Sequence, residues 1–401
     1  MFNSLSLKVI LFGFIFTFFS SFGQSFFLGL FNSSIRDALS ITHGQFGTIY
    51  ASATLLSSLL IIWVGKKIDD MDIFKFSLIV TLLLSFSSYF FSKVTSISFL
   101  FIAIFLMRFS GQGLMSHTAT TTISRYFTKS RGKALSTGWF GLSTAEFILP
   151  VFIIYLLTFM EWRNIWINIS FAILFLPILS YLLIKNIKLD SREIDNNKNK
   201  KNIKIKNWKR IEVIKDYRFY IVCANMLAMP WIATGIFVYQ SFISESKMWN
   251  IYTIPKAFMV YSVATIITLF FSGYLVDKFT SRKLIPIINI PLFFSMVTLF
   301  FFKNELSSFI FLGLIGVSNG LANVLGSSTW AEIYGVRYIG SIKALTTALM
   351  VFSTAFGTAL FGILIDRGFS IEDISFVCGV YIVTSLALLL FYRKKLEPIK
   401  L

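Results

Sequence analysis

The sequence has few of the residues from which catalytic and metal sites are built. Its 401 residues include two histidines and two cysteines, and both cysteines, Cys223 and Cys378, lie inside apolar stretches. It contains no His-Glu-x-x-His, Cys-x-x-Cys or phosphate-binding Gly-Lys-Ser/Thr motif. These absences argue against a disulfide framework, a metal site, an organic cofactor and an enzyme.

Charged residues are also scarce, whereas apolar residues are abundant. Only 14% of the residues are charged, 56% are hydrophobic, and the mean hydropathy is +0.74. A soluble domain needs more polar surface than this, so the composition predicts an all-α, polytopic membrane protein. The first apolar stretch, residues 7–31, is longer than the core of a secretory signal and has no small-residue cleavage site, so we expect it to be retained.

Twelve apolar stretches are long enough to cross about 30 Å of hydrocarbon. A basic insert, residues 186–216, separates six stretches from six, and we expect it to be a solvated linker without a core of its own. This predicts an N-terminal half over residues 1–185 and a C-terminal half over residues 217–401 with a short basic tail. The stretches are residues 7–31, 44–65, 73–92, 95–123, 133–158, 164–185, 217–241, 253–277, 283–302, 306–332, 341–366 and 371–392.

The distribution of basic residues predicts how the chain is threaded through the membrane. With the N-terminus inside, 29 of the 37 lysines and arginines fall on the inner side, seven fall in outer loops, and Arg108 stands alone in a stretch. Because cytoplasmic loops carry the excess of such residues, both termini are predicted to face the cytoplasm from a bacterial-type inner membrane. The net charge of +18 then needs no nucleic-acid partner, since the basic loops face lipid headgroups.

Short segments of the first half recur in the second half at nearly constant offsets. Gly65 and Asp69 match Gly273 and Asp277, 208 positions later, and a second pair of segments recurs about 210 positions later. The repeat favours two similar six-helix halves over chance repetition in an apolar chain.

The order of these features resembles the major facilitator superfamily over essentially the whole chain. The shared features are the twelve stretches, the long central linker, and a Gly-x-x-x-Asp loop with basic residues after stretches two and eight. The resemblance implies two pseudo-symmetric bundles that alternate access to a substrate between them. It also implies a conformational latch, with a plain topogenic loop as the alternative, formed by Gly65, Asp69, Gly273, Asp277, Arg282 and Lys283. The first copy departs from the family pattern after its aspartate.

A finer resemblance lies at the start of the fifth stretch. The segment YFTKSRGKALSTGWFG is similar to the signature of monocarboxylate and oxalate/formate transporters, with Tyr126, Phe127, Lys129 and Arg131 at its most specific positions. This resemblance implies a small organic acid as the substrate. Two features frequent in that branch are missing, namely an acidic residue in the first stretch and an arginine in the eighth.

Two opposite charges interrupt neighbouring stretches. Arg108 and Gln112 are predicted to lie one helical turn apart, and so on one face, in the fourth stretch, and Glu146 lies one turn before Pro150 in the fifth. A charge inside a membrane is costly unless it is paired or faces water, so both residues are candidates for a substrate or proton pathway. The alternative for Arg108 is a structural role, in which bonds to carbonyl groups and to Gln112 hold its helix in place. Glu146 would carry a proton, because an apolar setting favours the protonated carboxyl, or form a static ion pair with Arg108.

Neutral polar residues complete the candidate pathway. His117 lies nine residues after Arg108, on the opposite face of an α-helix, and is expected either to form an inter-helix hydrogen bond or to titrate near neutral pH. The other candidates are side-chain amides in the first, seventh and tenth stretches, of which the last two form the strongest pair: Gln24, Asn32, Asn225, Asn319 and Asn323.

These features together predict a secondary transporter that moves a small solute by alternating access. The favoured substrate is an organic anion that resembles a monocarboxylate and moves with a proton. Proton-driven efflux of amphipathic compounds is the alternative within transport, and a non-transporting membrane sensor or membrane enzyme is the alternative outside it. A monomer is sufficient for this function.

Overall fold

The computed structural model describes residues 4–127, 131–185, 206–335 and 337–398, and among these residues no strand occurs. Twelve helical segments of the described chain are long and apolar enough to cross a membrane, and we number them as spans 1 to 12 in chain order. They coincide closely with the predicted stretches, which confirms the all-α, twelve-span prediction. The largest difference is in span 1, whose regular helix ends at Ser20 instead of continuing to residue 31.

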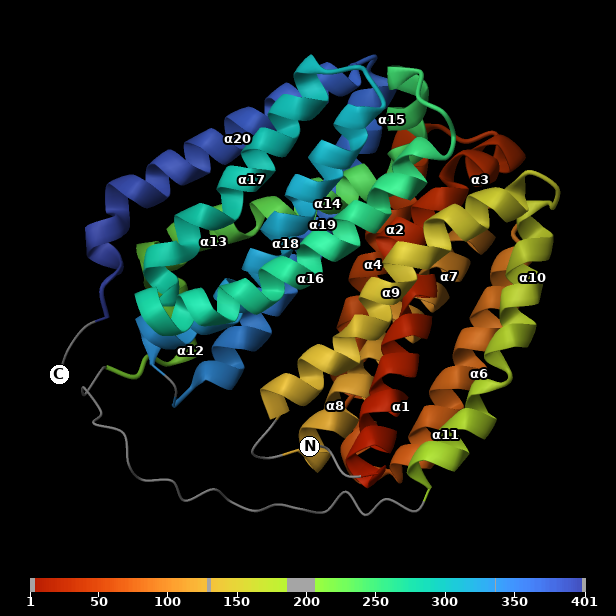
Figure 1. Ribbon diagram of the computed structural model, residues 1–401, viewed down its shortest axis with the longest axis horizontal. Coiled ribbons are helices and arrows are strands. Elements are labelled where there is room, and N and C mark those ends of the chain that lie inside the picture. The colour runs from red at the N-terminus through yellow and green to blue at the C-terminus, as the bar shows by residue number, and fades with distance from the viewer. Residues whose placement is uncertain (1–3, 128–130, 186–205, 336, 399–401) are drawn as a thin grey trace. The chain divides into compact units, whose positions relative to one another are not determined.

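The first of two compact units comprises Met1–Asn196 together with the short segment Phe237–Ser241. Within it, α1 lies beside α8 and α9, and α6 lies beside α10 and α11 (Figure 1). A π-helix, η3 (Arg108–Met115), joins α7 to α8 inside span 4. The helices of this unit are α1 (Ser4–Ser20), α2 (Ser25–Leu28), α3 (Asn32–Leu39), α4 (His43–Val64), α5 (Lys67–Asp70), α6 (Ile73–Ser92), α7 (Ile97–Met107), α8 (Ser116–Tyr126), α9 (Arg131–Leu157), α10 (Trp162–Ile173) and α11 (Leu176–Ile184), with 3-10 turns η1 (Ser21–Gly23) and η2 (Gly29–Phe31) after α1 and α2.

The second unit comprises Asn197–Ile236 and Phe242–Leu401. Here α18 packs between α16 and α17, and α17 also packs on α20. Buried aliphatic and aromatic side chains of these helices and of α13 form one core. The helices in this part of the chain are α12 (Arg210–Lys215), α13 (Tyr217–Met226), α14 (Ala228–Val238), α15 (Gln240–Lys247), α16 (Thr253–Phe279), α17 (Ser281–Phe301), α18 (Leu306–Tyr334), α19 (Ile339–Asp366) and α20 (Ile371–Tyr392), followed by the 3-10 turn η4 (Arg393–Leu396).

Spans 1 and 5 cross with their backbones in contact. The Thr17 hydroxyl of α1 donates a hydrogen bond of 2.6 Å to the Gly138 carbonyl of α9. A Cβ atom on Gly141 would collide with the carbonyl oxygen of Phe14. In lipid, helices associate through close packing of small residues and through hydrogen bonds between helices, because no hydrophobic force drives them together. The glycines of α9 therefore fasten span 5 to span 1.

The end of the predicted linker is folded onto the second unit, although we expected the whole insert to be solvated. The backbone N–H of Trp208 donates to the backbone carbonyl of Tyr334 at 3.0 Å. The Lys206 ammonium and the backbone N–H of Lys209 both contact the Glu212 carboxylate, and these contacts, the backbone bond above all, lower the pKa of Glu212. The tryptophan, whose ring stacks against basic side chains, supplies the contact that composition alone did not predict.

Candidate functional site

Span 1 is interrupted after α1 by a non-helical residue. η1 ends at Gly23, and Gln24 has an extended backbone with φ −83° and ψ 154° before α2 begins. A helix that stops leaves carbonyl oxygens without intrahelical partners. In transporters such interruptions supply backbone groups to substrates and ions, so this break is the first element of the candidate site.

Arg108 of span 4 binds at this break. Its Nη1 donates to the Gly23 carbonyl at 3.0 Å and to the Ser25 hydroxyl at 3.3 Å. The guanidinium carbon lies 5.3 Å from the centre of the Tyr50 ring, and the Tyr50 hydroxyl donates to Ser25 at 3.0 Å. The side chain is only 1% exposed. Arg108 therefore bonds a carbonyl, as the pinning alternative predicted, but it reaches another span to do so.

The geometry around Arg108 also corrects the predicted spacing with Gln112. Residues 108–115 form a π-helix, whose hydrogen bonds span five residues instead of four, so Gln112 is not one α-helical turn from Arg108. The wider turn brings the backbone against span 1, where a Cβ atom on Gly23 would collide with the Met107 carbonyl. Gln112 is half-buried, and the hydrogen bonds of the Arg108 side chain to described residues go to Gly23 and Ser25 and not to Gln112.

Glu146 is the second charged group buried in the first unit. It lies in α9, is 7% exposed, and forms no ion pair or side-chain hydrogen bond with any described residue. The predicted alternative of a static pair with Arg108 is therefore not formed. Pro150 lies inside the continuous helix and lacks the N–H that would bond the Glu146 carbonyl. Glu146 thus combines an unpaired carboxyl with a main-chain carbonyl that has no helical partner.

The predicted side-chain amides fall into three settings. The Asn32 amide donates to the Val238 carbonyl at 2.8 Å. A further amide outside the predicted set, that of Gln240, donates to the Phe26 carbonyl at 2.8 Å, and both bonds lie inside the first unit. Asn225 is fully buried, and its amide atoms have no hydrogen-bond partner in the described chain. Gln24 occupies the break itself.

Asn319 and Asn323, which were predicted to lie one turn apart in span 10, belong to a polar contact that extends to span 8. The Asn319 amide donates to the Tyr261 hydroxyl at 2.8 Å, and Asn323 lies 3.5 Å from the Asn319 oxygen. Asn323 is exposed. A polar side chain exposed inside a span faces water or a polar cavity more favourably than lipid, so this pair stays a candidate for the pathway.

The two copies of the predicted latch have different surroundings. In the first, the Gly65 carbonyl lies 3.0 Å from the His117 Nε2, which forms the predicted inter-helix hydrogen bond. In the second, a Cβ atom on Gly273 would meet nothing within 4 Å. The side chains of Asp69, Asp277 and Arg131, and all of Lys129, lie outside the described residues.

The basic residues of the second copy instead mark a helix end that is capped by a neighbouring span. The Glu332 carboxylate of α18 accepts hydrogen bonds from the backbone N–H groups of Ser281 and Arg282 at 2.8 and 3.1 Å. The Arg282 guanidinium lies 4.0 Å from the Glu397 carboxylate, and Lys283 is exposed. Glu332 was not among the predicted site residues, although an acidic residue at the end of an apolar stretch is a usable signal.

Glu332→Ala should lower the thermal stability of the purified protein. It removes the acceptor for two N–H groups at the start of α17, and a lost N-cap costs about 1 kcal/mol. The measurement is the melting temperature in detergent, with Glu397→Gln as the control. Because Glu397 is 71% exposed, that control should melt like the wild type. Equal melting temperatures for all three proteins would contradict the capping role.

The aromatic residues of the predicted signature have a packing role. Phe127 is buried in a small core with Val9, Ile10 and Ile123, and its ring meets the Tyr126 ring edge-on at 4.9 Å. These contacts join the end of span 4 to the beginning of span 1. These packing contacts account for the aromatic pair, and no contact with a substrate is needed to explain it.

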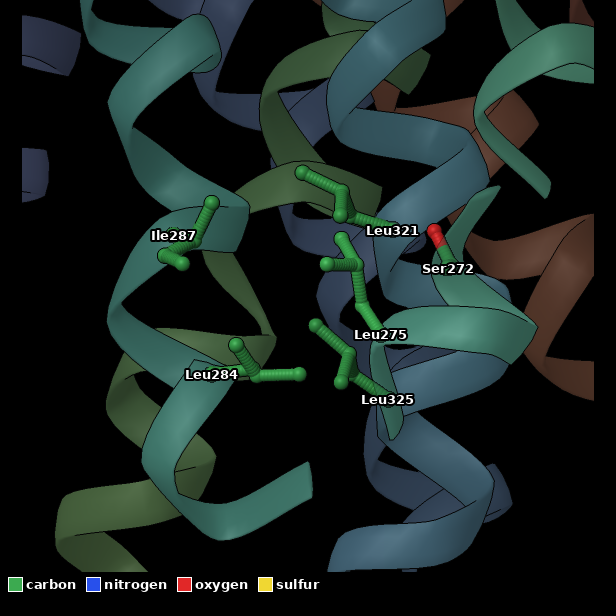
Figure 2. A pocket seen from close by; sticks show the side chains of 6 residues that line it. All are labelled: Ser272, Leu275, Leu284, Ile287, Leu321 and Leu325. Atoms are coloured by element: carbon green, nitrogen blue, oxygen red, sulfur yellow. The ribbon is translucent and has the colours of Figure 1, made fainter. Parts of the chain in front are cut away.

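An apolar pocket lies within the second unit. Its empty volume is about 190 Å³, and Figure 2 shows leucine and isoleucine side chains from α16, α17 and α18 around it. The single polar lining residue is Ser272. Sites for small molecules usually contain several converging polar groups, so this pocket, which has one, does not match the chemistry of the break in span 1. Its lining residues are Ser272, Leu275, Leu284, Ile287, Leu321 and Leu325.

Solved structures with a similar fold are membrane transporters. A bacterial homolog to the human lysosomal transporter Spinster, in an inward-facing and occupied conformation, matches with a TM-score of 0.70 and 13% identity over 97% of this chain and 96% of that one. The nucleoside transporter NupG matches with a TM-score of 0.68 and 14% identity over 98% and 99% of the two chains. At these identities the likeness shows the fold alone. A search of curated proteins finds no match.

A family model decides the assignment. The model of the Major Facilitator Superfamily matches residues 13–358, which is most of the chain. Both six-helix halves contribute to that match, and the twelve-span fold agrees with it. The chain therefore belongs to the major facilitator superfamily and is a membrane transporter rather than an enzyme.

Proposed function

We propose that this transporter carries a small organic anion together with a proton across the cytoplasmic membrane. Glu146 is the proton site, and Arg108 supplies the positive charge that the anion neutralises. The observation that carries the proposal is that two opposite charges are buried in one unit and neither is paired with an ionised group among the described residues. A buried charge without an ionic partner is strongly destabilising, which favours states in which a ligand or a proton neutralises it.

The net charge of the site formed by Arg108 and Glu146 couples the movement of the anion to that of the proton. The site is neutral when it is empty with Glu146 ionised, and neutral again when it holds both an anion and a proton. With only one of the two ligands it carries a net charge. Moving a unit charge through the membrane potential involves about 2.3 kcal/mol per 100 mV. Reorientation is therefore favoured in the two neutral states, which makes the transport an electroneutral symport.

The position of Arg108 supports an anion that binds close to the break in span 1. The guanidinium bonds only neutral oxygens, those of Gly23 and Ser25, so a carboxylate can exchange places with one of these acceptors and gain a charge-assisted bond. The likeness of the segment from Tyr126 to Arg131 to the monocarboxylate and oxalate/formate signature supports a small carboxylate as the anion. The predicted topology places both termini in the cytoplasm, and one chain forms the transporter.

Uptake into proteoliposomes tests this proposal. We expect at least one acid from a panel of formate, acetate, lactate, pyruvate and oxalate to accumulate when the proton gradient is directed inward. A protonophore should abolish accumulation, and no net current should accompany it. Accumulation without a gradient would contradict proton coupling. Failure of every acid to accumulate would contradict the proposal that the substrate is a small organic anion. In that case, inhibition of dye extrusion by unrelated hydrophobic cations would indicate that the protein is an efflux transporter.

A further inference from the structure

Side chains of span 4 hold the connection between spans 2 and 3 at two points. The His117 Nε2 lies 3.0 Å from the Gly65 carbonyl oxygen, and the Arg125 Nη1 donates to the Ile68 carbonyl at 3.0 Å. Gly65 caps the C-terminus of α4, and Ile68 lies in the short helix α5. Carbonyls at helix ends lack intrahelical N–H donors. The Gly65 carbonyl accepts one local bond, from the Ile68 N–H at 3.3 Å, and span 4 supplies a contact from another helix to it and to the Ile68 carbonyl.

The two contacts are far enough apart to fix an orientation as well as a position. His117 and Arg125 are eight residues apart in α8, which corresponds to about 12 Å along a helix. The Ile68 side chain is 1% exposed, so burial of this side chain anchors α5 at the second of the two bonds. A Cβ atom on Gly65 would lie 3.4 Å from the His117 Nε2, whereas Gly273 in the second copy has open space around it. The two-point contact is therefore a feature of the first unit that the repeat did not predict.

The chemistry of the bond fixes what the histidine contributes. A carbonyl oxygen only accepts, so Nε2 must carry a hydrogen. Both the neutral Nε2–H tautomer and the imidazolium meet this condition. The contact is therefore a hydrogen bond donated by His117 to the Gly65 carbonyl, which suits a fixed support.

We propose that His117 is a positioning residue for transport, which with Arg125 ties the connection between α4 and α6 to span 4. Span 2, this connection and span 4 then move as one body during transport. The connection carries the charged residues Lys66, Lys67, Asp70 and Asp72, and a fixed connection holds these charges in a constant place relative to span 4.

Hydrogen–deuterium exchange on the full-length protein in lipid nanodiscs tests the support directly. Exchange of the amides of residues 65–72 is compared in the wild type, His117→Gln, His117→Leu and Thr120→Val. The glutamine keeps an N–H donor, whereas the leucine removes it. Thr120 is the matched control because its hydroxyl bonds only carbonyls of its own helix. We expect exchange to rise about fivefold in His117→Leu, the effect of losing one hydrogen bond, and to stay unchanged in the other two variants.

An unchanged rate in His117→Leu, or an equal rise in His117→Gln, would overturn the support role. Transport gives a second measurement that rests on the proposed function. For the acid that the wild type accumulates, His117→Gln should keep the maximal rate and its pH profile, and His117→Leu should lower the maximal rate at unchanged KM. Loss of the pH profile in His117→Gln would make His117 a proton carrier instead. If no acid accumulates, the proposed function fails while the exchange rates still decide the support role.

Discussion

Glu146→Gln is expected to abolish the accumulation of substrate that a proton gradient drives, while exchange of labelled for unlabelled substrate continues. The amide has nearly the same size as the protonated carboxyl but cannot release a proton. The site is then fixed in the state that carries the anion, in which exchange needs no proton movement. Both quantities can be measured in the same proteoliposomes, with the gradient present for accumulation and absent for exchange.

A matched control shows whether the effect is specific to position 146 or follows from any replacement of glutamate by glutamine. Glu161 precedes α10, is exposed, and lies outside the spans, so Glu161→Gln should accumulate substrate like the wild type. Gradient-driven accumulation by Glu146→Gln at the wild-type level would refute the assignment of the proton site. Loss of both accumulation and exchange would show that Glu146 is needed for binding or folding instead of coupling.

Arg108→Gln should abolish transport, and Arg108→Lys should retain weak transport with a raised KM. Glutamine can still donate a hydrogen bond toward the Gly23 carbonyl but carries no charge. Lysine keeps the charge but lacks the planar group that reaches the Gly23 carbonyl and Ser25 together. In the proposal the positive charge of Arg108 binds the anion. The charge at position 108 should therefore matter more for transport than the hydrogen bond to the Gly23 carbonyl. The measurement is the initial rate of uptake against acid concentration for each variant.

Arg163 provides the matched control for this experiment. It also bonds a carbonyl, that of Val94 at 2.9 Å, and also lies over an aromatic ring, that of Trp162 at 4.3 Å. These contacts lie outside the break in span 1, so Arg163→Gln should lower the melting temperature but leave the KM unchanged. The opposite ranking at position 108, with glutamine more active than lysine, would mean that Arg108 serves only to hold the break.

The twelve spans could be predicted because each depends on a local property, a run of about 20 apolar residues that can satisfy its own backbone in lipid. The interruption of span 1 could not be predicted in this way. The residues around Gln24 are more polar than the rest of the span, but the contact that stabilises the break comes from Arg108, 84 positions later in the chain. The π-helix at Arg108 has the same origin, because its backbone is held against Gly23.

The candidate site was predictable to the extent that charge is rare inside a membrane. Arg108 and Glu146 stand out in apolar stretches, and the structure places both in one unit, yet their partners could not be inferred. Ser25 and Tyr50, which surround the guanidinium, look like ordinary residues of a span. The histidine at position 117 was expected to bond another helix, but only the fold shows that its acceptor is Gly65.

The contact between spans 1 and 5 has a mechanical consequence. Gly141 touches span 1 and lies five residues before Glu146 on the same helix, and Thr17 lies six residues before Gly23 on the other. The proposed proton site and the interruption therefore each lie about one and a half turns from this shared contact, the first on α9 and the second just after α1. A tilt of α9 of a few degrees when Glu146 gains or loses its proton would therefore move α1 at Thr17 and, through the short turn η1, the Gly23 carbonyl.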